Sequence, residues 1–210
     1  RTTYHDHSAL VSFIRDTSEG KYIERTRGTR VKLSQEFGTD IFGGNYIYQN
    51  TLFELHKFFP LGKEHLIGNR LLGATSSGRD KGCFRLFGFD RVRTSNTYKT
   101  GKKIEPYLGA NIIVDNLEYR FPIVHDINYH MWYLFPDFFF RSFYGIAFFD
   151  LGTAWDDISP KAKDIVYCYG IGIKFDTFIL QLFYLPLNFY ISYSPINDKY
   201  EFLFTLGSMF

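Results

Sequence analysis

Apolar and polar residues alternate one by one along most of this chain, and no segment shows a convincing helical period. The stretch YCYGIGIKF at 167–175 carries aromatic and aliphatic residues at its odd positions, and cysteine, glycine and lysine at its even positions. Successive side chains of a strand point to opposite faces, so this pattern predicts strands with one apolar and one polar face. The alternation therefore predicts an all-β fold.

Nine strands are predicted, separated by segments rich in Gly, Pro, Asn and Asp. Their ranges are 8–15, 28–38, 48–59, 64–75, 108–121, 138–151, 165–180, 187–195 and 200–210. A long irregular insert, about residues 76–107, lies between the fourth and fifth strands and is rich in Gly, Arg, Lys, Ser and Thr. A loop of that length is usually functional or disordered. No change in composition divides residues 1–210, so we expect one domain or the C-terminal part of one.

Two architectures fit strands of this kind. A soluble β-sandwich buries its apolar faces inside, whereas a transmembrane β-barrel turns them toward lipid. Aromatic residues make up 20% of the chain although its mean hydropathy is only −0.16. Several predicted strands reach about 11 residues, the length that a tilted membrane strand needs. These two observations favour an antiparallel transmembrane β-barrel, while the sandwich stays an alternative.

Composition gives little support to other classes of function. The formal net charge is +2, which favours neither nucleic acid nor an acidic partner. The sequence contains no Gly-x-Ser-x-Gly, P-loop or His-Glu-x-x-His motif. Its two cysteines, Cys83 and Cys168, are too few for a disulfide framework and too isolated for a zinc site, although a single bridge between them stays open. We expect no enzyme, no metal site and no cofactor.

Five segments together resemble one family. They are IRDTSEG with RGTRVKLSQEFG (14–38), NLEYRFPI (116–123), FFDLGTAWDD (148–157), YGIGIKF (169–175) and YEFLFTLGSMF (200–210). In this order they resemble the outer-membrane BamA/TamA barrel superfamily, also called bacterial surface antigen. The resemblance implies the C-terminal portion of a transmembrane barrel, with about eight or nine strands in this chain.

The resemblance also assigns a role to the long insert. In the family, a long loop folds back into the barrel and its tip arginine reaches carboxylates on the inner wall. Val92-Arg93 matches the first half of that tip, whereas Thr94 and Ser95 stand where a glycine and an aromatic residue belong. By the match of motifs, the partners of Arg93 are Glu118 and Asp150, and the alternative is a solvated loop arginine. The three residues form a predicted loop lock.

The last strand is the second predicted site. Its resemblance to the family's sorting signal implies that assembly machinery reads this strand. The side chains expected to face lipid are Phe202, Phe204, Leu206 and Phe210.

For function, the resemblance implies insertion or translocation of outer-membrane proteins. The alternatives are a non-catalytic outer-membrane anchor or pore that holds a soluble partner domain, and a soluble β-sandwich binding module. Expected partners are the lipid bilayer and outer-membrane protein substrates or an assembly complex, with no nucleic acid. The expected location is the outer membrane of a bacterium, or of an organelle of bacterial origin.

Overall fold

The computed structural model describes residues 5–20, 25–41, 43–62, 64–94, 108–131, 137–156, 160, 164–180, 182–196 and 198–207. The elements assigned within these ranges are strands. They are β1 (Ser8–Asp16), β2 (Gly28–Gly38), β3 (Tyr48–Gly62), β4 (His65–Ser77), β5 (Phe84–Arg85), β6 (Leu108–Gly109), β7 (Asn111–Val124), β8 (Tyr129–Met131), β9 (Phe138–Trp155), β10 (Val166–Ile179), β11 (Phe183–Tyr184), β12 (Leu187–Ser194) and β13 (Lys199–Leu206). The described ranges contain no helix that is long and apolar enough to cross a membrane.

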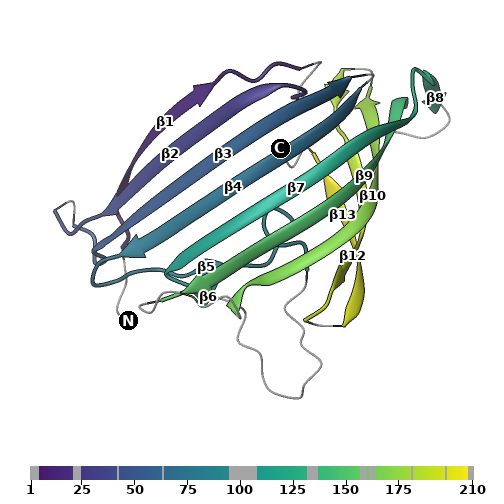
Figure 1. Cartoon of the computed structure of the whole chain (residues 1–210). Coiled ribbons are helices and arrows are strands. Elements are labelled where there is room, and N and C mark those ends of the chain that lie inside the picture. Colours follow the sequence, from purple (N-terminus) through teal and green to yellow (C-terminus); the bar gives the residue numbers. More distant parts are fainter. Residues whose placement is uncertain are drawn as a thin grey trace.

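Nine of these strands form one antiparallel meander, in the order β1-β2-β3-β4-β7-β9-β10-β12-β13. The sheet curls strongly, so that β12 and β13 turn back behind β9 and β10 (Figure 1). The short strands β8 and β11 extend β9 and β10, and β5 pairs with β6 in a separate two-stranded sheet. All nine predicted strands are present. β9 ends four residues later than predicted because the ladder continues to Trp155, and the described part of the last strand ends at Leu206.

The sheet has two ends, which we name by their connections. The loop end carries the β2–β3, β4–β7, β9–β10 and β12–β13 connections, and includes the long insert. The turn end carries the β1–β2, β3–β4, β7–β9 and β10–β12 connections. In Figure 1 the loop end lies below and the turn end above.

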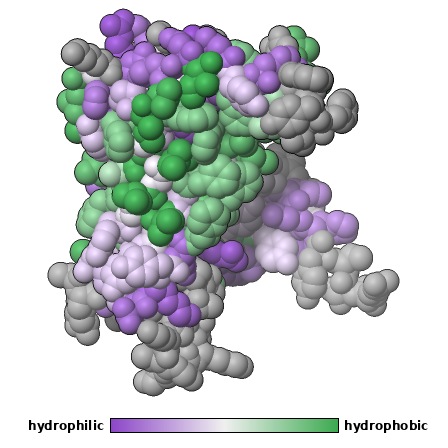
Figure 2. Space-filling model, turned by 90° about the vertical axis from the view of Figure 1, so that its right-hand side faces the viewer, coloured by the Kyte–Doolittle hydropathy of each residue, from purple (hydrophilic) through white to green (hydrophobic). Residues whose placement is uncertain are grey.

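Burial separates the two faces as the alternation predicts. On β7, Ile112, Val114, Asn116, Glu118 and Arg120 are buried on the concave face, whereas Ile113 and Leu117 are 44% and 43% exposed on the convex face. Figure 2 shows hydrophobic residues gathered in a broad band on the convex side, with hydrophilic residues above and below it. Such a band is typical of a wall that faces lipid.

Aromatic rings cross the convex face from strand to strand. Toward the turn end, Phe143 and Phe175 have ring centroids 4.5 Å apart, Phe175 and Phe189 5.7 Å, and Phe189 and Phe204 4.8 Å. Toward the loop end, tyrosines take over. Tyr169 lies 5.6 Å from Tyr193, which lies 4.9 Å from Tyr200. Tyrosine at one border of an apolar band is typical of a membrane interface.

The sheet does not close within the described residues. β1 pairs only with β2, and β13 only with β12. The first and ninth strands of an antiparallel meander run in the same direction, so pairing β13 with β1 would be parallel, unlike every other pair in the sheet. An antiparallel closure requires an odd number of further strands. The described residues also contain no second large sheet packed against the first, as a sandwich requires. The all-β antiparallel fold is confirmed, and closure into a barrel stays a prediction.

Two glycines of β10 leave room for aromatic rings of the neighbouring strands. A Cβ on Gly170 would lie 2.7 Å from Cζ of Phe148, and a Cβ on Gly172 would lie 2.6 Å from Cδ1 of Tyr190. Phe148 of β9 and Tyr190 of β12 therefore lie across β10 on the concave face. This close approach explains why glycine alternates on the inner face of YGIGIKF.

We predict that Gly170→Val lowers the free energy of unfolding by about 1–3 kcal/mol, because the new side chain collides with the Phe148 ring and the Ile191 carbonyl. The matched control is Gly73→Val on β4, where an added Cβ meets nothing within 4 Å. Urea unfolding in detergent micelles measures both variants. Equal losses for the two would contradict the ring-packing explanation.

Candidate functional site

The long insert folds back onto the concave face of the sheet. It leaves β4 at Ser77, and its two-stranded sheet pairs Phe84 with Gly109 and Arg85 with Leu108. Its first residues are fastened to the β2–β3 connection. The Asp80 carboxylate accepts a hydrogen bond from the Ile47 backbone N–H at 2.9 Å, and this bond lowers the pKa of Asp80. The base of the insert is therefore held at the loop end of the sheet.

A tight turn at residues 88–92 places the tip of the insert against the concave face of the sheet. The Arg91 N–H donates to the Gly88 carbonyl at 3.2 Å, and the Gly88 N–H donates to the Val92 carbonyl at 3.2 Å. Gly88 has φ +155°, a conformation that favours glycine. The expected glycine and aromatic residue after Arg93 are absent, yet a tight turn forms, and it precedes Arg93. Thr94 is buried, and Ser95 lies outside the described residues.

Apolar residues of the insert and the wall form a core around this turn. Leu86 and Val92 are fully buried, and Phe87 is 5% exposed. They pack with inward-facing side chains of β4, β7, β9, β10 and β12, which include Leu72, Ala74, Ile112, Val114, Ile146, Phe148, Val166, Cys168 and Tyr190. The insert thus supplies part of the hydrophobic core of the concave side.

Arg93 lies at the centre of this core and pairs with two carboxylates. Its Nε and Nη2 donate to the two oxygens of Asp150, each at 2.7 Å, and its Nη1 donates to Glu118 Oε1 at 2.5 Å. Its backbone N–H also donates to Asp150 Oδ2 at 3.2 Å. The side chains of all three residues have no exposed surface. The planar guanidinium suits this bidentate contact in a way that a lysine ammonium would not.

The charges of the cluster balance within the protein. Arg120 of β7 donates to the second oxygen of Glu118 through Nη2 at 2.9 Å, so two arginines face two carboxylates. A buried charge without a partner costs several kcal/mol, and removing one partner of a buried pair typically costs about 3–5 kcal/mol. The four charged groups can therefore stay buried only together, because removing any one of them would leave one of the remaining charges uncompensated.

Two aromatic rings cover the guanidinium. Its Cζ lies 3.7 Å from the centroid of the Phe148 ring and 5.1 Å from that of Tyr190. The two rings meet edge to face, with centroids 5.6 Å apart. An aromatic face attracts a cation more strongly where water is excluded. The rings for which Gly170 and Gly172 leave room thus enclose Arg93.

Two further wall residues hold the backbone of the tip, and the sequence did not single them out. Arg70 of β4, 5% exposed, donates to the Asp90 carbonyl and pairs with Glu54 at 2.7 Å. Asn116 of β7 donates to the Arg91 carbonyl at 2.7 Å. Their inward position follows from the alternation of β4 and β7, but a bond to a loop carbonyl leaves no signal in the sequence.

The sequence-predicted residues are placed as follows. Arg93, Glu118 and Asp150 meet in one buried cluster, and whether that cluster acts as a lock stays a prediction. Phe202, Phe204 and Leu206 are 67%, 44% and 58% exposed on the convex face of β13, and Phe210 lies outside the described residues.

The two cysteines, which could have formed a bridge, are free in the structure. Cys83 is exposed, and Cys168 is buried beside Asp150.

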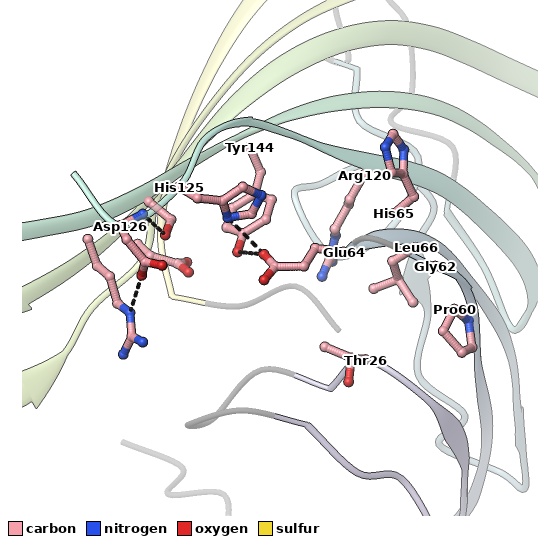
Figure 3. A pocket seen from close by; sticks show the side chains of 13 residues that line it. Thr26, Pro60, Gly62, Glu64, His65, Leu66, Arg120, His125, Asp126 and Tyr144 are labelled. Carbon is pink, nitrogen blue, oxygen red and sulfur yellow. Dashed lines mark hydrogen bonds and ion pairs between the residues drawn. The ribbon is translucent and has the colours of Figure 1, made fainter. Parts of the chain in front are cut away.

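A cavity of about 300 Å³ opens on the concave side at the turn end. Figure 3 shows the Glu64 carboxylate between His125 and Tyr144, at 2.9 and 3.1 Å, with Arg120 and His65 farther along the wall. The lining mixes both signs of charge. Among the described residues, no group of three or more His, Cys, Asp and Glu side chains is placed to hold a metal ion.

We predict that Arg93→Ala loosens the insert, because it leaves Asp150 and Glu118 as buried carboxylates and costs about 3–5 kcal/mol. Limited proteolysis of the folded protein should show faster cleavage within residues 78–107. The matched control is Arg79→Ala, which removes the same charge from an exposed position of the same insert. Equal cleavage rates for Arg93→Ala and the wild type would contradict a locking role.

We also predict that Asp150→Asn destabilises the fold by about 3–5 kcal/mol, since an amide removes the charge and turns a donor toward Arg93. The control is Asp115→Asn on the convex side of the adjacent strand, where the carboxylate accepts one bond from Asn69 at 2.6 Å. Urea midpoints compare the two. A midpoint for Asp150→Asn at or above that of Asp115→Asn would show that the carboxylate charge is dispensable.

Comparison with known proteins gives one result for the whole chain. The family model for the Omp85 superfamily domain matches residues 1–210. A search of curated proteins returned no match. Because the match covers the full chain, it identifies the family, and this family agrees with the resemblance found from the motifs. The chain therefore belongs to the Omp85 superfamily.

Proposed function

We propose that this chain is the membrane-embedded wall of an outer-membrane protein that inserts or translocates other outer-membrane proteins. Membership of the Omp85 superfamily supports this proposal, because the family acts in general in the insertion and translocation of proteins at the outer membrane. The proposal assigns the chain to the outer membrane of a bacterium, or of an organelle of bacterial origin. It involves no catalytic group.

The observation that carries the proposal is that β1 is exposed and has one edge unpaired within the described part of the chain. Its outer edge has no partner among the described residues, and all nine of its residues are exposed. Leu10 and Ile14 alternate with Val11 and Phe13, and their exposed fractions range from 51% to 67%. β1 therefore exposes apolar side chains on both faces, although Ser8, Ser12 and Asp16 share the inner face with Leu10 and Ile14.

Such a strand can bind another strand. Lipid cannot satisfy backbone N–H and C=O groups, so an open edge in the membrane must pair. Open edges are also templates for pairing with an incoming chain. β1 can thus pair with further strands of a closed barrel, or exchange that pairing for a strand of a substrate protein.

The buried cluster fastens strands that lie away from the open edge of β1. Its ion pairs join the insert to β7 and β9, and Arg70 joins it to β4, so the fastened strands are in the middle of the sheet. The edges can then change partners while the centre of the wall keeps its shape. In this proposal the loop lock preserves the wall during exchange at the seam.

A second function is supported by the same cluster. Balanced, fully buried charges and an apolar core around residues 86–92 favour a static, filled interior. A static wall suits a non-catalytic outer-membrane anchor or pore that holds a soluble partner domain. Under this alternative the loop lock provides stability, and the open edge of β1 only completes the barrel.

We predict that the full-length protein, reconstituted in liposomes, accelerates the membrane folding of a urea-unfolded outer-membrane barrel protein. Folding is measured by the altered gel mobility of the folded barrel without heating. We expect Arg93→Ala to lose most of the acceleration, and Arg79→Ala to keep it. Each variant is first shown to be inserted in the liposomes.

The outcomes separate the candidates. Acceleration by the wild type supports insertion. No acceleration by an inserted wild-type protein favours the anchor or pore. Acceleration that Arg93→Ala leaves unchanged would retain the insertion function but remove the loop lock from it.

A further inference from the structure

The β10–β12 turn has an unusual composition for a strand connection. Residues 177–187, TFILQLFYLPL, contain no charged residue. The other connections at the turn end are charged, with Glu19, Lys21, Glu24, Arg25 and Arg27 in one and Lys63 and Glu64 in another. Leu182 and Phe183 are nevertheless 77% and 65% exposed. Apolar side chains exposed together at a turn indicate a contact surface.

The backbone of this turn adds a second observation. Leu180 has φ 51°, in the left-handed region that bulky side chains disfavour. The other described non-glycine residues with positive φ are polar, namely Glu64, Asp126, Asn128 and Asp198. Asn or Gly would suit the conformation of Leu180, and a polar side chain would suit its 45% exposure in water. A leucine at this position fits an apolar environment.

The position of the turn along the strand identifies that environment. On the convex face of β10, the tyrosine border lies at Tyr169. An apolar band of about 25 Å, crossed by a strand tilted by about 40° with a rise of about 3.3 Å per residue, takes about ten residues. Ten residues after Tyr169 is Ile179, the last residue of β10. The band therefore extends to the turn, and the turn lies at its edge.

Three backbone N–H groups in the described part of the turn have acceptors within the protein, as a lipid environment requires. The Leu180, Leu182 and Leu185 N–H groups donate to the carbonyls of Asp137, Ile179 and Thr177, at 2.8, 3.1 and 2.8 Å. The titratable side chains beside the turn have partners within the protein: His130 Nε2 lies 2.5 Å from Asp137 Oδ1, and Asp176 Oδ1 accepts a hydrogen bond from the Tyr184 hydroxyl at 2.8 Å. Backbone hydrogen bonding of this kind is a requirement for a segment within a bilayer.

We propose that the β10–β12 turn is inserted into the acyl-chain layer of the bilayer, where Leu180, Leu182 and Phe183 anchor this sector of the wall. The proposal rests on the membrane placement given above and adds to it a specific lipid contact. The partner is the hydrocarbon region of the lipid, because the surface is uncharged and continuous with the apolar convex face. The three other connections at this end contain charged residues, which favour water over the acyl-chain layer.

Collision measurements on spin labels test this contact. In the full-length protein, Cys83→Ser removes the exposed thiol, and the buried Cys168 is left in place after a check that it takes no label. A nitroxide is then attached at Leu182→Cys. Ile171→Cys, 65% exposed on the convex face of β10, is the lipid reference, and Glu19→Cys in the β1–β2 connection is the water reference. All are reconstituted in liposomes of phosphatidylethanolamine and phosphatidylglycerol.

We expect the ratio of oxygen to nickel-chelate collisions at position 182 to lie within about twofold of the ratio at 171 and well above the ratio at 19. A ratio at 182 equal to that at 19 would place the turn in water and overturn the proposal. Protection from both reagents would show a protein contact and overturn it equally. Should Leu182→Cys fail to insert, Phe183→Cys provides the same measurement.

The label at position 171 distinguishes a failure of this proposal from a failure of the proposed function. If the label at 171 is also reached mainly by the nickel chelate, the membrane placement itself is wrong. If position 171 is in lipid and position 182 is not, only the insertion of the turn is wrong.

Discussion

The burial of Arg93 is the constraint on which the concave side depends. A guanidinium without exposed surface requires carboxylates that are equally dry, and Asp150 and Glu118 provide them from two adjacent strands. Glu118 in turn requires Arg120, and the guanidinium is covered by Phe148 and Tyr190. Those rings lie across β10, which explains its two inward-facing glycines. Inward-facing residues of β7, β9, β10 and β12 are thus fitted to one charged side chain at the tip of a loop.

Alternation of apolar and polar residues was sufficient to predict the strands, because most wall strands have one face that is more buried than the other. β1, whose nine residues are all exposed, is an exception. Arg93, Glu118 and Asp150 could be named together because short motifs resemble a family in which such residues meet. Arg70 and Asn116 could not be named, since they bind the carbonyls of Asp90 and Arg91, and main-chain acceptors do not depend on residue type. The strand that pairs with the outer edge of β1 could not be predicted either, because the register within a sheet does not determine which strand pairs with its edge.

The two faces of the wall place different demands on the sequence. On the concave face, the charged side chains of the buried cluster must meet specific partners, so a substitution there affects several strands at once. On the convex face, the requirement is only an apolar surface with aromatic residues near its borders, and many side chains satisfy it. The convex face therefore explains the aromatic-rich composition, whereas the concave face explains the position of individual charges and glycines.

The lengths of the strands have a mechanical consequence. β9 has 18 residues and pairs along its length with β7 and β10, whereas β12 and β13 pair over eight residues. A force that peels the sheet from the β13 side first meets a short ladder, and then a long one reinforced by the buried ion pairs. The force needed to separate neighbouring strands therefore rises from the β12–β13 edge toward the middle of the sheet. Separation that begins at β13 should stop before β9, with the central strands still carrying the load.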